Sequence, residues 1–175
     1  MKKFLKAISM ITAMFVLLLS MASCSGYSFY KDFKEAGASI EEENIFIEIS
    51  LEDAKTKKAA GETFVLLYGN SSNSECVTVV TTLQVQAEYL GNPTAKVYFL
   101  NSKDYKTSSD RKTVREAINM HDPSSDGAPI VMTFRATAVD VDTSNKDKVK
   151  TKQFIKDGVV QYASLSSYIF KDLLK

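Results

Sequence analysis

The sequence predicts an α/β domain, because apolar segments typical of buried strands alternate along the chain with segments of helical pattern. The clearest strand is residues 64–68, an uninterrupted apolar run that ends at Gly69. Ser50 precedes a helical stretch and is suited to capping its first turn. Near the C-terminus, Asp157-Gly158 is a strong hairpin signal between two short apolar segments. The predicted order is strand and helix three times, then two strands and a final helix.

The remaining elements are expected from local patterns of the same kind. Residues 77–90 fit both a helical face and strand alternation; their length and the following Gly91-Asn92-Pro93 favour a helix. The other expected elements are strands over residues 45–49, 95–100 and 128–141, and helices that start at Ser50, Asp110 and Ser166 or Ser167.

The first 23 residues have the pattern of an export signal. A basic segment at residues 1–6 precedes an apolar run over residues 7–19, which is too short for a confident transmembrane helix. Met21-Ala22-Ser23-Cys24 resembles a bacterial lipobox, in which the cysteine is acylated and becomes the first residue of the mature chain. That resemblance implies a palmitate-type lipid anchor at Cys24 and a place on the extracytoplasmic face of the cell membrane. An ordinary cleaved secretory peptide and an uncleaved anchor are the alternatives.

The mature chain would form one nearly neutral domain. Removing residues 1–23, which carry three lysines and no acid, leaves 19 basic and 21 acidic side chains, a net charge of −2. Such a balance gives no electrostatic footprint for nucleic acid. Residues 24–44 are expected to form a tether, whose aromatic residues could alternatively pack a short helix onto the domain or the bilayer. Residues 45–175 are expected to form the domain itself.

The stretch from Phe64 to Cys76, FVLLYGNSSNSEC, resembles the strand, loop and cysteine of a thioredoxin active site. Ala128-Pro129 is similar to the proline that is cis in thioredoxins and lies beside that loop. Within the superfamily, the stretch is most similar to thioredoxin-like proteins associated with bacteriocin export. The resemblance covers residues 45–175 and implies a three-layer fold with a central mixed sheet of four to five strands flanked by helices. The segment from Ala136 to Gln153 exceeds the short connection usual between the last two strands of that superfamily, which predicts an extended C-terminal β-hairpin.

The redox motif of that superfamily is incomplete in this chain. Asn73 stands where the nucleophilic cysteine of Cys-x-x-Cys is expected, and only the second position, Cys76, is a cysteine. An asparagine at a helix start is suited to capping a backbone N–H. Cys76 then has two interpretations: a small buried core residue, or a monothiol that forms a mixed disulfide with a partner.

Other candidate sites are few. Ala128 and Pro129 could provide an edge for an extended peptide, although Pro129 could equally be a stabilising turn residue. His121 is the only histidine, and loop acids such as Asp122 and Asp126 are usually turn formers, so no metal site and no cofactor is expected.

The sequence therefore predicts a lipoprotein, held in the bilayer by acylated Cys24, whose domain binds or assists another exported protein without turnover. The alternative is a thiol-disulfide oxidoreductase or accessory protein acting through Cys76. A solute- or peptide-binding lipoprotein is a third class.

Overall fold

The computed structural model describes residues 25–174 apart from residues 121–122, 124, 137–148, 154, 157–158 and 161–165. The predicted signal peptide, Cys24, His121 and Asp122 lie outside the described residues.

A mixed sheet of five strands forms the centre of the α/β fold, in the order β1-β3-β2-β4-β5. Strands β1 and β2 both run parallel to β3, whereas β4 is antiparallel to β2 and β5 is antiparallel to β4. This order is compatible with a thioredoxin-like layout. The strands are β1 (Phe46–Glu48), β2 (Phe64–Gly69), β3 (Val97–Asn101), β4 (Ile130–Ala136) and β5 (Val149–Gln153).

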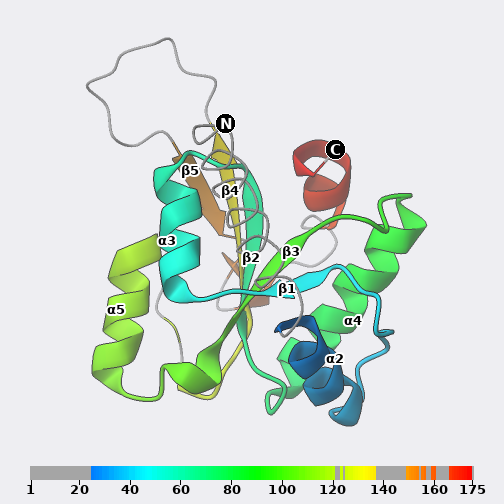
Figure 1. The fold of residues 1–175 in the computed structure, drawn as a ribbon, viewed down its shortest axis with the longest axis horizontal. Helices are drawn as coiled ribbons and strands as arrows, with labels where there is room; N and C mark the ends of the chain where they lie inside the picture. The colour runs from blue at the N-terminus through cyan, green and yellow to red at the C-terminus, as the bar shows by residue number, and fades with distance from the viewer. Residues whose placement is uncertain are drawn as a thin grey trace, which may run out of the picture.

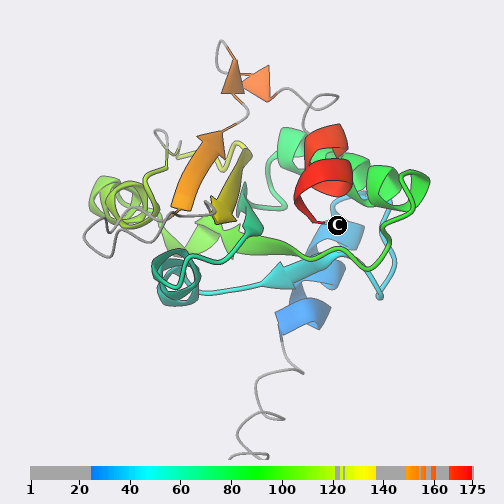
Figure 2. The same cartoon turned by 90° about the horizontal axis from the view of Figure 1, so that it is seen from above.

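Helices cover both faces of the sheet, which gives three layers (Figures 1 and 2). On one face lie α2 (Ser25–Glu35), α4 (Ser74–Tyr89) and the short C-terminal helix η2 (Tyr168–Leu173); on the other lie α3 (Leu51–Ala59) and α5 (Ser108–Ile118). Among the described residues, no helix is both long enough and apolar enough to cross a bilayer.

The central strand β2 is buried along its whole length because it contributes to a core on each side. Val65 and Leu67 belong to the core under α2 and α4, whereas Leu66 and Tyr68 belong to the core under α3 and α5. Successive side chains of a strand point to opposite faces, so a strand between two helical layers needs apolar residues at every position. Burial on both faces explains why residues 64–68 form an uninterrupted apolar run in the sequence.

Helix starts follow the capping patterns of the sequence. Ser50 caps α3 as expected: its hydroxyl accepts from the Asp53 N–H at 3.1 Å, and Asp53 completes a capping box. The helix expected to begin at Asp110 instead begins at Ser108. Thr107 is its N-cap, and Asp110 is the third helical residue, whose carboxylate accepts from the Thr107 N–H. The ambiguous segment after residue 73 is a helix, α4.

The C-terminal region agrees with the prediction in part. Strands β6 (Ile155–Lys156) and β7 (Val159–Val160) pair antiparallel in a separate two-stranded sheet. The turn between them lies outside the described residues, and so do residues 137–148, within the segment for which an extended hairpin is predicted; that hairpin stays a prediction. Ile169 and Leu173 of the final helix are buried as expected, whereas Leu174 is only partly buried.

For much of residues 24–44, the alternative expectation of a short helix packed on the domain holds, in place of a tether. Phe29 and Phe33 of α2 are each 1% exposed, and their rings lie 4.8 and 5.4 Å from the Phe99 ring of β3. Ala38 and Ile40 are buried in the same core. Aromatic residues spaced four apart share one face of a helix, and here that face covers the sheet beside β1. The structured domain therefore begins within α2, well before residue 45.

Because Phe33 is a buried core ring, replacing it with alanine should lower the free energy of unfolding by about 3–5 kcal/mol. Lys31→Ala changes an exposed residue of the same helix and should cost less than about 0.5 kcal/mol. Urea unfolding followed by circular dichroism measures both. Equal, small effects of the two substitutions would mean that α2 is a spacer after all.

Candidate functional site

Four of the residues singled out in the sequence, Asn73, Asp126, Ala128 and Pro129, lie where three loops converge at one end of the sheet strands. We call this place the loop junction: residues 69–73 after β2, residues 101–102 after β3, and residues 126–129 before β4. Gly69 pairs with Asn101, and Tyr68 pairs with Ile130. Because β2 and β3 are parallel and β4 is antiparallel, the carboxyl ends of the first two strands lie beside the amino end of the third.

Asn73 caps the helix that follows the loop junction, as its position in the sequence predicts. Its side-chain oxygen accepts a hydrogen bond from the Cys76 N–H at 3.1 Å. Cys76 is thereby placed in the first turn of α4. An amide at this position satisfies a helix N–H but provides no nucleophile, so Asn73 acts here as a structural cap.

Cys76 is enclosed by the backbone of β2 and by the α4 core. Its side chain is 0% exposed, and it belongs to the core between α2, α4 and the sheet. A methyl group built on Gly69 would lie 2.5 Å from the Cys76 Sγ atom, closer than real side-chain atoms approach. The sulfur occupies the space that a side chain at residue 69 would need, so glycine is the residue that fits there.

Burial raises the pKa of the Cys76 thiol to about 12, and a hydrogen bond from the backbone of Asn70 lowers it only in part. Near neutral pH the sulfur is a protonated thiol. Thiol-disulfide exchange needs a thiolate that can reach its target, and Cys76 meets neither condition.

Asn70 is a buried polar residue of the junction that sequence reasoning did not single out. Its amide donates to the Ser102 Oγ atom at 2.6 Å and its carbonyl oxygen accepts from the Ser72 N–H at 2.9 Å. A side chain at Gly127, which has a φ of +78°, would collide with the Asn70 amide. An asparagine directly after a buried strand was the available signal. Asn70 links all three loops of the junction.

The third loop is closed by hydrogen bonds to itself and to the helix cap. The Asn73 amide donates to the Asp126 carbonyl oxygen at 3.4 Å, and the Asp126 carboxylate accepts from the Ala128 N–H at 3.0 Å. Pro129 is buried and Ala128 is half-buried. Of the predicted peptide-binding edge, Ala128 is thus the accessible part.

The proline of the third loop differs from the thioredoxin pattern. The described residues contain no cis peptide bond, so the bond between Ala128 and Pro129 is trans. The cis geometry that the resemblance implied for this position is therefore wrong for this chain.

No group of three or more histidine, cysteine, aspartate or glutamate side chains within the described residues is arranged to hold a metal ion. Asp126 is exposed and binds a backbone N–H of its own loop, as a turn-forming acid does.

No protein-family model matches the chain, and no curated protein matches it either.

If the Cys76 sulfur excludes a side chain at residue 69, Gly69→Ala should cost about 1–3 kcal/mol of stability. In a Cys76→Ala background the same substitution should cost at least about 1 kcal/mol less, because the colliding sulfur is gone. Urea unfolding of the four proteins gives this coupling. Val114→Ala, in the core on the other face of the sheet, is the matched control and should be additive with Gly69→Ala. Additivity in both pairs would contradict the proposed contact.

The raised thiol pKa also predicts a loss of stability at alkaline pH. Between about pH 9 and 12 the unfolded thiol loses its proton while the native thiol keeps it, so the unfolded state binds fewer protons and the free energy of unfolding falls as pH rises. Between pH 8 and 11 the wild-type protein should lose about 2–3 kcal/mol more than Cys76→Ala. Burial also raises the pKa of Tyr68 to about 12, and that contribution is common to both proteins. Identical losses would show that Cys76 ionises normally in the native state.

Proposed function

We propose that this chain is a membrane-anchored exported lipoprotein whose thioredoxin-like domain binds or assists another exported protein without redox turnover. The observation that carries the proposal is the state of Cys76: a fully buried, protonated thiol that is the only cysteine among the described residues.

The thioredoxin-like assignment is supported by topology and by the position of the broken motif. In the sheet, β1 and β2 lie on either side of β3 and run parallel to it, and the antiparallel strands β4 and β5 follow beyond β2. This order is compatible with that fold. Cys76 lies in the first turn of the helix after β2, and Pro129 lies at the entrance of β4, where the motif and the proline of thioredoxins are found.

Loss of turnover follows from what disulfide exchange requires. One cysteine attacks a substrate disulfide, and a second releases the substrate by attacking the mixed disulfide. Asn73 cannot do the first, and Cys76 is enclosed against Gly69. The enzymatic alternative, a monothiol acting through Cys76, would need α4 to separate from β2 before the sulfur could react.

The anchor at Cys24 is supported by the N-terminal pattern of basic, apolar and small residues. The fold determines how closely such an anchor would hold the domain to the membrane. Helix α2 begins at Ser25, and Phe29 is already part of the core. With Cys24 acylated, only a few residues would separate the lipid from the packed domain. The domain would then be held against the bilayer surface, where partners are other exported or membrane-bound proteins.

A partner would meet a surface formed by exposed residues of the loop junction and of the first turn of α4. Ser72, Ser74 and Glu75 are exposed at the start of α4, and Asp126 is exposed on the third loop beside half-buried Ala128. We assign partner binding to this surface, to which Ala128 contributes, whereas Pro129 beside it is buried.

Membranes from cells that express the full chain provide the test. The wild-type chain should be found in the membrane fraction, whereas Cys24→Ser should be released. On native membranes a maleimide of high mass should leave Cys76 unmodified near neutral pH, and after denaturation in urea it should modify one thiol per chain. We expect Cys76 to be protected from the maleimide because its sulfur is buried and its thiol pKa is high.

The experiment tests the lipid anchor and the absence of redox turnover independently. Release of the wild-type chain into the soluble fraction would overturn the anchor alone. Rapid native labelling of Cys76, with a discrete mixed disulfide to an envelope protein that Cys76→Ala does not form, would overturn the non-catalytic assignment.

A further inference from the structure

Strand β1 is at one end of the strand order, so it has β3 on one side and an outer edge on the other. The Ile49 N–H donates to the Phe99 carbonyl oxygen at 2.9 Å, and the Ile45 carbonyl oxygen accepts from an N–H of β3 at 2.8 Å. In a parallel pair, alternate residues of a strand bond to the neighbouring strand. The backbone polar groups of Phe46 and Glu48 therefore point away from β3, toward the outer edge.

Part of this edge is open. The Phe46 N–H donates to the side-chain oxygen of Asn44 at 3.0 Å, which closes the beginning of the edge. Further along, the N–H and the carbonyl oxygen of Glu48 have no hydrogen-bond partner among the residues that the structure describes, and Glu48 is half-buried. Unpaired groups of this kind are a template for pairing with another extended chain.

Two cavities adjoin β1, one of about 620 Å³ and one of about 600 Å³, and both are rich in acids. The acidic residues of the linings are Glu48, Asp53, Glu62 and Asp104 in the first cavity and Glu42, Glu43 and Glu88 in the second. Lys57 is the one base among the described residues of the two linings. Its amine lies 2.8 Å from the Glu62 carboxylate, so it offsets that acid and not the others.

The other lysines near this edge are also paired. The Lys34 amine lies 3.3 Å from the Glu41 carboxylate, and the Lys103 amine lies 3.7 Å from the Asp32 carboxylate. Within the part of the chain that the structure describes, no ion pair is formed by five acids of the two linings, Glu42, Glu43, Glu48, Glu88 and Asp104. Negative charge around β1 is therefore not neutralised by the described part of the protein.

Glu48 lies at the centre of this charge. Burial raises the pKa of its carboxyl group, a hydrogen bond with Asn101 lowers that pKa, and the charges of Asp104 and Asp32 raise it again. A cationic side chain placed beside Glu48 would relieve this repulsion.

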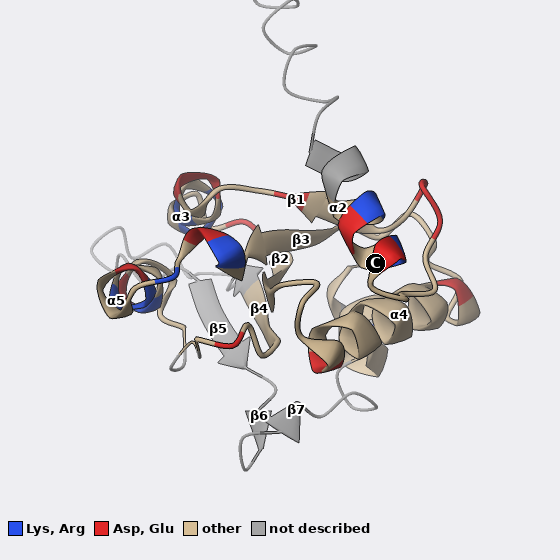
Figure 3. Ribbon diagram, turned by 90° about the horizontal axis from the view of Figure 1, so that it is seen from below, with Lys and Arg blue, Asp and Glu red and all other residues tan. Residues whose placement is uncertain are grey.

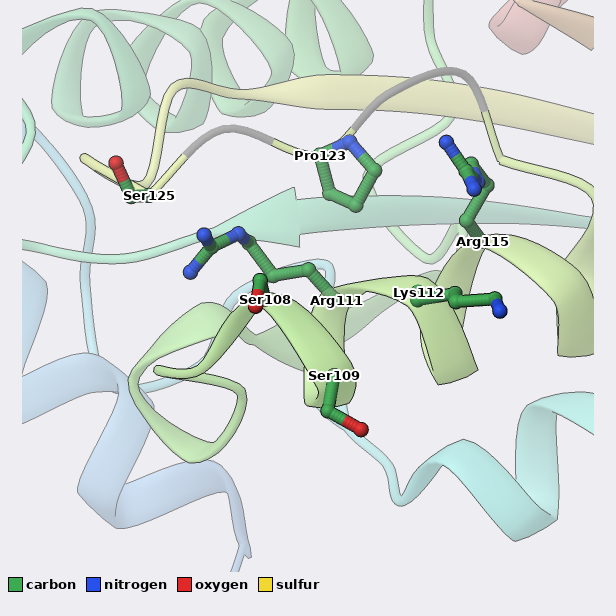
Figure 4. Close-up of a pocket in the computed structure, with 7 residues that line it drawn as sticks. All are labelled: Ser108, Ser109, Arg111, Lys112, Arg115, Pro123 and Ser125. Atoms are coloured by element: carbon green, nitrogen blue, oxygen red, sulfur yellow. The ribbon is translucent and has the colours of Figure 1, made fainter.

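Acidic residues gather at this part of the surface although the overall charge of the chain is close to zero. Figure 3 shows acids on the loop that leads into β1, on β1 itself and on α3. A third cavity, beside α5, has a different lining, which includes Arg111, Lys112 and Arg115 (Figure 4).

We propose that the outer edge of β1 binds an extended, lysine- or arginine-rich segment of another protein, which adds to the sheet as a new strand. The backbone of the segment exchanges hydrogen bonds with Glu48, and its alternate side chains reach the acids on the two sides of the sheet. A second copy of this chain does not suit the edge, because acids would then face acids. The proposal rests neither on the state of Cys76 nor on the lipid anchor.

The test measures fluorescence anisotropy of a dye-labelled peptide with the full chain in a non-ionic detergent. The probe is a hexapeptide of alternating lysine and valine. Saturable binding of one peptide per chain is expected, with a Kd below about 1 mM. Binding should weaken as salt screens the charges, and a peptide with glutamate in place of lysine should not bind.

A second peptide separates strand addition from simple attraction of charges. Methyl groups on the backbone nitrogens of its four central residues remove the N–H donors and leave the lysine charges unchanged. Because it cannot donate to the edge, this peptide should bind about threefold or more weakly than the first.

Variants of the protein locate the binding at β1. Glu48→Gln/Asp104→Asn should weaken binding about threefold or more, because two unpaired charges are lost. Glu48→Gln keeps the outward N–H, whereas Glu48→Pro removes it at an edge position where proline is tolerated, so Glu48→Pro should weaken binding further than Glu48→Gln. The matched control, Glu75→Gln/Glu116→Gln, changes two exposed acids on α4 and α5 and should leave the affinity within about twofold.

Three results would overturn the proposal. The first is no saturable binding of the lysine peptide to the folded wild-type chain at millimolar peptide. The second is equal binding of the methylated and unmethylated peptides, which would mean attraction of charges without an added strand, and this comparison does not require any variant to fold. The third is self-association of the wild-type chain in sedimentation that folded Glu48→Pro abolishes, which would make a second copy the occupant of the edge.

Discussion

The seating of the Cys76 sulfur against the backbone of Gly69 is the contact on which the rest of the structure depends. It joins the end of the central strand β2 to the first turn of α4, with no space for any side chain at residue 69. The four residues between them must then form a tight loop, which Asn70 and Asn73 stabilise with their side-chain amides. The positions of the neighbouring loops follow, because Asn70 binds Ser102 and contacts Gly127.

The same contact decides the chemistry of the thiol. A helix N-terminus favours an anion by about 0.3–1 kcal/mol, and by up to about 2 kcal/mol in partly buried sites. A rise in pKa from 9.0 to about 12 corresponds to roughly 4 kcal/mol in the other direction. Desolvation therefore outweighs the helix, and a location that activates thiols in redox proteins here holds a neutral core residue. Position in a fold does not by itself carry activity.

Helix α2 connects the proposed lipid anchor to the packed domain. Its aromatic residues are part of the core, with Phe29 stacked on Phe46 at 4.9 Å between ring centroids. An anchor attached just before α2 would therefore hold the sheet, and with it the loop junction, at a defined distance from the bilayer. A long spacer would instead let the domain move freely above the membrane.

Much of the fold could be read from local patterns. The apolar run of β2, the Ser50 cap of α3 and the Asn73 cap of α4 each depend on residues that are neighbours in the sequence. The helix at residues 74–89 could be expected from its length, although its β-branched residues also suit a strand. The start of α5 was misplaced because Thr107 and Asp110 are both good capping residues, and the sequence does not say which is the N-cap and which is the third residue.

The sequence by itself determined the alternation of strands and helices from β1 to β4, the single cysteine, Cys76, of residues 64–76 and the capping role of Asn73, because each of these is a local property. Only the tertiary structure decided that Phe29 and Phe33 belong to the core and that Asn70 joins three loops. Each of these depends on contacts between segments that are distant in the chain. Burial of the Cys76 sulfur is of the same kind: the cysteine is visible in the sequence, but the desolvation that neutralises it comes from the packing of α4 against β2.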